Sequence, residues 1–103
     1  MSNWILVSTV ESFDEIPRQF IDMDNLHIAV WKIEGEFYAF ESMCTHSMFE
    51  LDEAPTEGNE IICPLHGARF CLRTGEVLAP PAYEGLRVFP VRVDEGRVEI
   101  DYS

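Results

Sequence analysis

Two short segments of the chain each place one cysteine close to one histidine. Residues 44–46 read CTH and residues 63–66 read CPLH, with sixteen residues between them. Cysteine thiolate and neutral imidazole are both ligands of zinc and of iron. Brought together, the two segments would supply two sulfur and two nitrogen ligands, which suits either a tetrahedral zinc ion or an iron–sulfur cluster. The candidate metal ligands are therefore Cys44, His46, Cys63 and His66.

The distribution of these ligands differs from that of a zinc finger. Structural Cys2His2 fingers usually carry both cysteines in one loop and both histidines in one helix. Here each segment is mixed, and no helix is expected at either. A two-iron cluster in which one iron has two cysteine ligands and the other has two histidine ligands needs such mixed segments. A structural zinc site is the alternative, and iron content would separate the two.

The sequence resembles the Rieske-type [2Fe-2S] ferredoxins of bacterial aromatic-ring-hydroxylating dioxygenase systems. The resemblance rests on CTH at 44–46 and CPLHG at 63–67, and it continues through Thr74-Gly75, Pro80-Pro81 and a final hairpin at Gly96. It implies one [2Fe-2S] cluster, shielded by a third loop at Pro80-Pro81. It also implies that one iron is bound by Cys44 and Cys63 and the other by His46 and His66.

The same resemblance implies a function in electron transfer. The chain would carry one electron from an NAD(P)H-dependent flavoprotein ferredoxin reductase to a terminal Rieske non-haem iron oxygenase, and would not itself be an enzyme. The sequence contains no nucleotide-binding glycine motif. A zinc-bound interaction module, which would be colourless, and a redox sensor, which a reductase would not reduce rapidly, are the alternatives.

The reduction potential is expected to be low for a Rieske centre. High-potential Rieske proteins carry a disulfide and hydroxyl groups near the cluster at positions that correspond here to Phe49, Leu65, Ala68 and Phe70. None of these side chains has a thiol or a hydroxyl. We therefore expect a potential toward the lower end of the roughly −150 to +300 mV range of Rieske centres.

Short apolar runs bounded by turn residues predict the elements that must position these ligands. The pattern indicates an all-β scaffold with an inserted loop-rich subdomain. The resemblance implies that this is a Rieske domain, with antiparallel sheets in a sandwich and the cluster bound by the inserted subdomain. Hairpin turns are expected at Gly35 and Gly96, and Pro90 predicts a strand edge or a bulge. A helical turn is expected near 12–16, and strands are expected at 4–8, 26–33, 37–42, 60–63, 69–73, 76–78, 87–93 and 97–102.

Residues 1–103 are expected to form a single Rieske domain, with the cluster-binding subdomain at about 43–85. Those residues hold all three cysteines and most of the prolines. Cys71 is interpreted as a small buried apolar residue and His27 as an ordinary surface or partly buried side chain. The core is expected to include Phe13, Phe20, Phe37, Tyr38, Phe40, Val88, Phe89, Val91, Val93, Val98 and Ile100.

The composition excludes several kinds of partner. A net charge of −12 and a pI near 4.4 disfavour binding to nucleic acid and to anionic membranes. No apolar stretch approaches the roughly 20 residues of a membrane helix, and no secretion signal is evident. Three cysteines are an odd number, so a cytoplasmic location is expected. The acidic segment 50–60 is either a solvated loop or a docking surface that steers basic partners.

Overall fold

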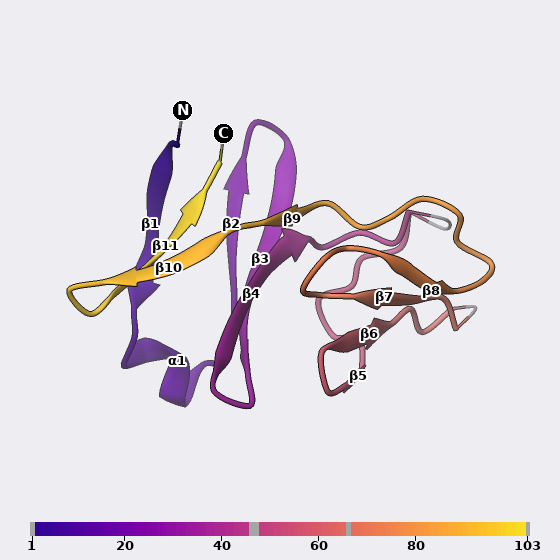
Figure 1. The fold of residues 1–103 in the computed structure, drawn as a ribbon, viewed down its shortest axis with the longest axis horizontal. Helices are drawn as coiled ribbons and strands as arrows, with labels where there is room; N and C mark the ends of the chain where they lie inside the picture. The colour runs from indigo at the N-terminus through magenta and orange to yellow at the C-terminus, as the bar shows by residue number, and fades with distance from the viewer. Residues whose placement is uncertain (1, 46–47, 66, 103) are drawn as a thin grey trace.

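The computed structural model describes residues 2–45, 48–65 and 67–102 and confirms the all-β prediction (Figure 1). A single short helix occurs in the described residues, and it is too short to cross a membrane. The elements are β1 (Trp4–Thr9), α1 (Ser12–Glu15), β2 (Arg18–Met23), β3 (Leu26–Ile33), β4 (Glu36–Glu41), β5 (Thr56–Glu57), β6 (Glu60–Ile62), β7 (Arg69–Cys71), β8 (Val77–Ala79), β9 (Val88–Phe89), β10 (Val91–Asp94) and β11 (Arg97–Asp101).

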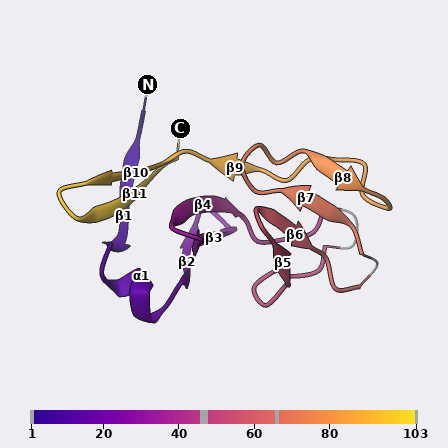
Figure 2. The same cartoon turned by 60° about the horizontal axis from the view of Figure 1, so that its bottom comes forward.

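The strands form three antiparallel sheets. Their orders are β1-β11-β10, β2-β3-β4-β9 and β5-β6-β7-β8. The first two sheets, here called the scaffold, lie together at one end of the molecule, which measures 40 × 29 × 19 Å. The third, here called the cluster-side sheet, lies at the other end, and the chain enters it from β4 and leaves it toward β9 (Figure 2).

Both predicted hairpin turns are confirmed. Glu34 and Gly35 join β3 to β4 with φ angles of 50° and 83°, and Glu95 and Gly96 join β10 to β11 with 52° and 76°. Two consecutive residues in the left-handed region give the turn whose twist matches that of antiparallel strands. Glycine at the second position removes the steric cost of that conformation.

A hairpin strand that the sequence did not predict is β2. It pairs with β3 across a turn at Asp24 and Asn25, whose φ angles are 47° and 67°. The sequence of β2 does not alternate clearly between apolar and polar residues, because β2 is an edge strand that contacts the core with few side chains. The expectation that Phe20 lies in the core is wrong for the same reason, since its side chain is exposed. The short strand β5 was also not predicted.

Pro90 divides the strand expected at 87–93 into two strands that belong to different sheets. β9 pairs with β4 in one sheet, and β10 pairs with β11 in the other. Proline has no N–H to continue a ladder, but its carbonyl still accepts a hydrogen bond from the Asp101 amide at 2.9 Å. β10 is thus an edge strand, and Val93, which was expected in the core, is half exposed.

The buried apolar residues form two clusters. The first lies in the scaffold and includes Phe13, Ile28, Val30, Ala39, Phe89, Val98 and Ile100. The second joins the other face of β3 and β4 to the cluster-side sheet through Trp31, Phe40, Leu51, Ile61, Phe70 and Leu72. Cys44 and Cys63 both belong to the second cluster, so the scaffold and the two cysteine segments share one packed interior.

Candidate metal centre

The second cysteine segment is the tip of the hairpin formed by β6 and β7. Cys63 follows β6 directly, and its amide donates to the Ala68 carbonyl at 2.8 Å. The Gly67 amide donates back to the Cys63 carbonyl at 3.0 Å, with a Gly67 φ of 78°. We call residues 63–68 the Cys63 turn. Its two ends are the first residues beyond paired strands, so the sheet itself fixes the position of the cysteine.

The first cysteine segment has the same backbone pattern. The Cys44 amide donates to the Phe49 carbonyl at 2.8 Å, and the Met48 amide donates to the Cys44 carbonyl at 2.9 Å. Met48, like Gly67, lies in the left-handed region, with a φ of 59°. We call residues 44–49 the Cys44 turn. An isolated bridge between Met43 and Glu50 flanks it in place of a strand pair.

The two cysteine side chains have the burial that an iron–sulfur cluster requires. Cys44 is 0% exposed and Cys63 is 1% exposed, and no disulfide joins any of the three cysteines, all of which lie in the described residues. Buried thiolates on two matching turns fit a cluster that takes two sulfur ligands. His46 and His66, the other predicted ligands, lie outside the described residues.

The third loop, residues 80–86, lies against the Cys44 turn. It begins with the cis peptide bond between Pro80 and Pro81. The Thr45 hydroxyl donates to the Glu84 carbonyl at 2.7 Å, and the Leu86 amide donates to the Gly75 carbonyl at 2.7 Å. A cavity of about 170 Å³ at this contact is lined by Glu41, Met43, Cys44, Thr45, Met48 and Glu84. That this loop shields the cluster stays a prediction.

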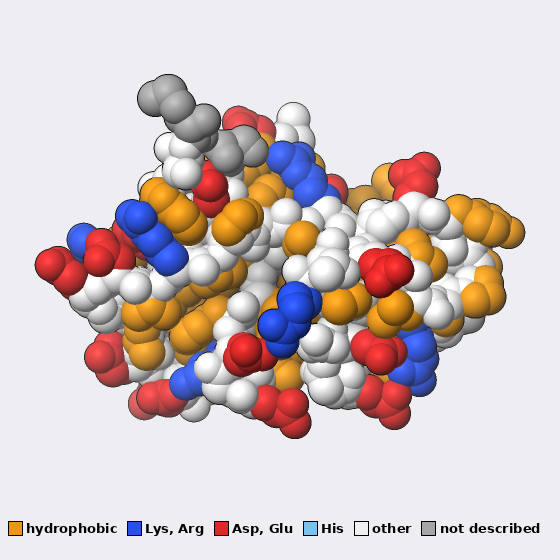
Figure 3. Space-filling view, in the orientation of Figure 1, with side chains coloured by type: hydrophobic (Ala, Val, Ile, Leu, Met, Phe, Trp, Pro, Cys, Tyr) orange, Lys and Arg blue, Asp and Glu red, His pale blue; other side chains and the backbone are white. Residues whose placement is uncertain are grey.

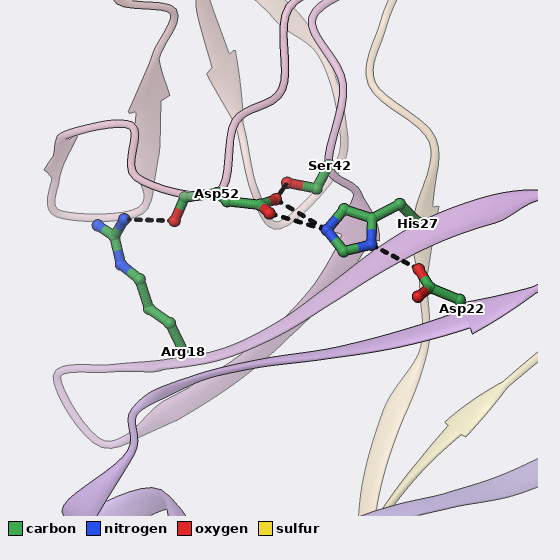
Figure 4. Close-up of polar contacts among 5 residues, drawn as sticks. All are labelled: Arg18, Asp22, His27, Ser42 and Asp52. Atoms are coloured by element: carbon green, nitrogen blue, oxygen red, sulfur yellow. Dashed lines mark hydrogen bonds and ion pairs between the residues drawn. The ribbon is translucent and has the colours of Figure 1, made fainter.

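A network around His27 links the scaffold to the Cys44 turn, and the sequence did not reveal it (Figure 4). His27 Nδ1 lies 2.5 Å from Asp22 Oδ1 on β2, and Nε2 lies 2.9 Å from Asp52 Oδ2. The Ser42 hydroxyl donates to Asp52 Oδ1 at 2.6 Å, and Arg18 donates to the Asp52 carbonyl at 3.1 Å. His27 is partly buried, as expected. Its partner Asp52 lies 25 residues away, which is why no local pattern identified the pair.

The groups in this network shift one another's pKa values. The hydrogen bond to Asp22 raises the pKa of His27; partial burial opposes the rise, and the contact with Asp52 adds to it. Burial alone would raise the pKa of Asp52, but hydrogen bonds from Ser42 and His27 outweigh it and lower that pKa. The hydrogen bond to Asp52 raises the pKa of Glu50. The arrangement therefore holds the imidazole between two carboxylates, which favours its protonated form.

The same network contains three potential metal-binding atoms that lie within 4.8 Å of one another, one each from His27, Glu50 and Asp52. This oxygen-rich set differs from the thiolate and imidazole set of the two cysteine turns. Both ring nitrogens of His27 already face carboxylates. The contacts that are present make this group an ion-pair network.

The acidic segment 50–60 is partly neutralised by cations elsewhere in the fold. Arg69 on β7 lies 2.7 Å from Glu57 and 3.3 Å from Glu60, and His27 pairs with Asp52. The segment is thus not uniformly solvated. Glu50 and Glu53 remain at its exposed surface.

Cys71 is not the small buried apolar residue that the sequence suggested. It ends β7 and is partly exposed. Burial raises the pKa of its thiol, but hydrogen bonds from Thr74 and Arg73 outweigh that effect and lower the pKa. The turn that follows β7 directs these donors at the sulfur, a feature that residue type alone does not indicate.

Comparisons with known proteins agree with this geometry. The Rieske [2Fe-2S] domain model matches residues 3–90. The chain is 36% identical over 96 residues to the biphenyl dioxygenase ferredoxin subunit of Pseudomonas sp. (strain KKS102), covering 89% of this chain and 88% of the relative. It is 36% identical over 83 residues to the ferredoxin component of the naphthalene 1,2-dioxygenase system of Pseudomonas putida, covering 81% and 80%.

A solved structure shows the same fold. It is the complex of reduced oxygenase and oxidized ferredoxin in carbazole 1,9a-dioxygenase. One chain of that complex matches with a TM-score of 0.84 and 31% sequence identity. The match covers 95% of this chain and 92% of that chain. These relatives are named ferredoxins, that is, electron carriers and not catalysts. The family match spans most of the chain and includes both buried cysteine turns. The chain therefore belongs to the Rieske [2Fe-2S] domain family, whose cofactor is one Rieske-type [2Fe-2S] cluster.

Proposed function

We propose that this chain is the ferredoxin component of an aromatic-ring dioxygenase system. It receives one electron from an NAD(P)H-dependent flavoprotein reductase and passes it to the Rieske centre of a terminal oxygenase. The observation that carries the proposal is the likeness, over nine-tenths of the chain, to a biphenyl dioxygenase ferredoxin subunit. The neighbour captured in complex with its oxygenase supports the same role. A cytoplasmic location belongs to this proposal, because the reductase would draw on NAD(P)H.

Within this function, Cys44 and Cys63 hold one iron and His46 and His66 hold the other. The cluster-binding subdomain is about residues 43–85, which include the whole cluster-side sheet. When bound, the cluster accepts and releases one electron. The chain itself buries the two thiols in an apolar interior and holds each in a turn closed by two backbone hydrogen bonds. Rigid, preformed turns reduce the rearrangement that accompanies a change of charge.

The surroundings of the second turn support a low reduction potential. Ala68 and Phe70 are both buried in the core cluster that includes Cys63. Neither side chain has a hydroxyl, so neither donates a hydrogen bond to a cluster sulfur. Hydrogen bonds to the sulfurs stabilise the added electron and raise the potential. Their absence at these two positions suits a carrier that receives electrons from a flavin.

A surface that suits redox partners surrounds the two cysteine turns. Met48, Leu65 and Tyr83 are exposed apolar or aromatic side chains of the two turns and the third loop. Figure 3 shows apolar side chains at the end of the molecule occupied by the cluster-side sheet, with acidic side chains around them. A hollow of about 320 Å³ nearby is lined by Phe49, Glu50, Asp52, Glu53, Ala54 and Pro64. Apolar walls and acidic rims suit the Lys and Arg side chains of a partner.

Anaerobic reduction of the purified holoprotein tests the function in two steps. Dithionite should bleach the visible absorption and produce the electron spin resonance signal of low average g that is typical of a reduced Rieske centre. NADH with the flavoprotein reductase of a biphenyl dioxygenase system should then cause the same bleaching. Addition of the matching oxygenase, with biphenyl and oxygen, should restore the colour and yield dihydrodiol.

Each step has an outcome that would overturn a different part of the proposal. A colourless protein that contains zinc would make the chain an interaction module. A normal Rieske signal with dithionite but no bleaching by several dioxygenase reductases would make it a redox sensor or a carrier for another system. A rate of transfer that does not depend on ionic strength would remove the acidic surface from the docking step.

A further inference from the structure

His27 holds both ends of the segment that contains the Cys44 turn. Before the turn, the Ser42 amide donates to the His27 carbonyl at 2.8 Å. After the turn, Asp52 contacts the His27 imidazole at 2.9 Å. The two ends are also joined to each other, because the Ser42 hydroxyl donates to Asp52 at 2.6 Å and the Leu51 amide donates to the Ser42 carbonyl at 3.3 Å.

The imidazole is itself fixed on the scaffold. His27 lies in β3, and its ring stacks on Phe20 of β2 with centroids 5.1 Å apart and planes 6° from parallel. Asp22, also on β2, faces the other ring nitrogen. The side chain of His27 is 30% exposed and that of Asp52 is 25% exposed, so their contact is shielded in part from water. A contact of this kind is stronger than one between fully exposed ions.

The charged groups around His27 come from two sides. Asp22 faces it from β2, while Asp52 and Glu50 face it from the segment after the Cys44 turn. Arg18 lies beyond Asp52, where it bonds the Asp52 carbonyl and stacks on Trp31 at 3.8 Å, with Glu53 nearby. Acidic groups therefore outnumber cations at this site, and a protonated imidazole neutralises part of their charge.

We propose that His27 is a positioning residue for the cluster: its imidazole, held between Asp22 and Asp52, fastens the Cys44 turn to the β2–β3 hairpin and thereby slows loss of the cluster. The inference rests on the proposed function only in taking Cys44 as an iron ligand. The Cys63 turn has no need of such a fastening, because β6 and β7 hold it directly.

The charge of His27 gives the fastening a dependence on pH. The pKa of folded His27 is raised above its ordinary value of 6.5. The stabilisation is therefore complete below about pH 6.5 and is lost as the pH rises through the raised value. Burial opposes the change, but hydrogen bonds from Ser42 and His27 lower the pKa of Asp52, so this partner keeps its negative charge over the window.

The test measures how fast the oxidised holoprotein loses its visible absorption in excess EDTA, from pH 6 to pH 9. In the wild type, the rate should rise with pH. In His27→Gln, the rate at pH 6 should be about threefold to tenfold faster than in the wild type and should show a weaker rise. Any dependence that comes from the histidine ligands is common to both proteins, so the difference between the two profiles reports His27.

Two further variants keep the test decisive if His27→Gln folds poorly. Asp52→Asn should accelerate cluster loss at pH 6, and its combination with His27→Gln should add little, because both remove the same contact. Asp22→Asn, at a side chain that is 78% exposed, should shift the rise in rate to lower pH by removing one partner of the imidazolium. Asp14→Asn is the matched control. It removes an ion pair with Lys32, which lies on β3 like His27 but away from the Cys44 turn.

Parallel pH profiles for the wild type and His27→Gln would overturn the proposal, as would additive effects of His27→Gln and Asp52→Asn. A second outcome would also overturn the proposal. If Zn²⁺ added without EDTA slows cluster loss in the wild type but not in Asp52→Asn, then His27, Glu50 and Asp52 form a cation site. The Rieske signal of the wild-type protein is measured separately, so failure of the proposed function would appear there and not in these comparisons.

Discussion

The Cys44 turn and the Cys63 turn close with the same two backbone hydrogen bonds but are held by different parts of the molecule. The Cys63 turn ends a strand pair, so the backbone ladder of β6 and β7 supports both of its ends. In the described residues the Cys44 turn has a single bridge beside it, and two backbone hydrogen bonds at its base join Ser42 to His27 and Leu51 to Ser42. It therefore depends more on side chains, which are those of Ser42, Asp52 and His27 at its base and Thr45 at its side. Two ligand turns with one geometry can therefore respond differently to mutation and to pH.

The largest effect should come from the cysteines themselves. Cys44→Ser and Cys63→Ser should each abolish the cluster, because a serine oxygen is a poor substitute for a thiolate at iron in such a site. Iron content and visible absorption would measure the loss. Cys71→Ser is the matched control and should keep both iron atoms. A protein that retains the cluster without Cys44 or Cys63 would refute the ligand assignment.

The next largest effect is expected where the third loop meets the turn after β7. A Cβ added to Gly75 would lie 2.0 Å from the Leu86 carbonyl oxygen, and Gly75 has a φ of 83°. Gly75→Ala should therefore lower the free energy of unfolding by about 3 kcal/mol or more. Gly35→Ala provides the control and should cost only about 1 kcal/mol, because Gly35 has the same φ but an added Cβ would meet none of the described residues beyond its chain neighbours. Urea unfolding would measure both, and equal losses would contradict the clash.

Gly67 and Met48 occupy the same left-handed position in the two turns, so substitutions at these residues measure the free-energy cost of that backbone conformation. Gly67→Ala should cost about 1 kcal/mol, because Gly67 has a φ of 78° and an added Cβ would have no atom of the other described residues within 4 Å, its chain neighbours aside. Met48→Gly should instead stabilise the protein by about 0.5 kcal/mol, since Met48 holds a left-handed conformation and its side chain is 69% exposed. Thermal unfolding of the holoprotein would measure these changes. A destabilised Met48→Gly would mean that the methionine side chain supports the turn.

The smallest effect should come from the contact between the Cys44 turn and the third loop. Thr45→Val removes the hydrogen bond to the Glu84 carbonyl while keeping the shape of the side chain. We expect a loss of about 0.5–1.5 kcal/mol in the free energy of unfolding and faster loss of the cluster in EDTA. Thr45→Ser keeps the hydroxyl and should restore most of both. If valine behaves like serine, the contact does not hold the loop.

Local sequence predicted much of the fold because its signals act over a few residues. Glycine after Glu34 and Glu95 identified two hairpins, and the helical turn after Ser12 was found. The strand β2 was missed, although Asp24 and Asn25 are residues that accept the left-handed turn preceding β3. Pro90 predicted a strand edge or a bulge, but it did not predict that the chain passes there from one sheet to another. That outcome depends on how the two scaffold sheets pack, which no local pattern records.

The sequence by itself determined the family and the candidate ligands, because two cysteine–histidine segments with this spacing suit few other metal sites. Tertiary structure decided what supports each segment. The cluster-side sheet holds the Cys63 turn through backbone pairing, while His27, far away in the sequence, meets Asp52 only because β2 and β3 fold beside the Cys44 turn. Hydrogen-bond networks between distant residues depend on packed positions, so they become visible only in the folded protein.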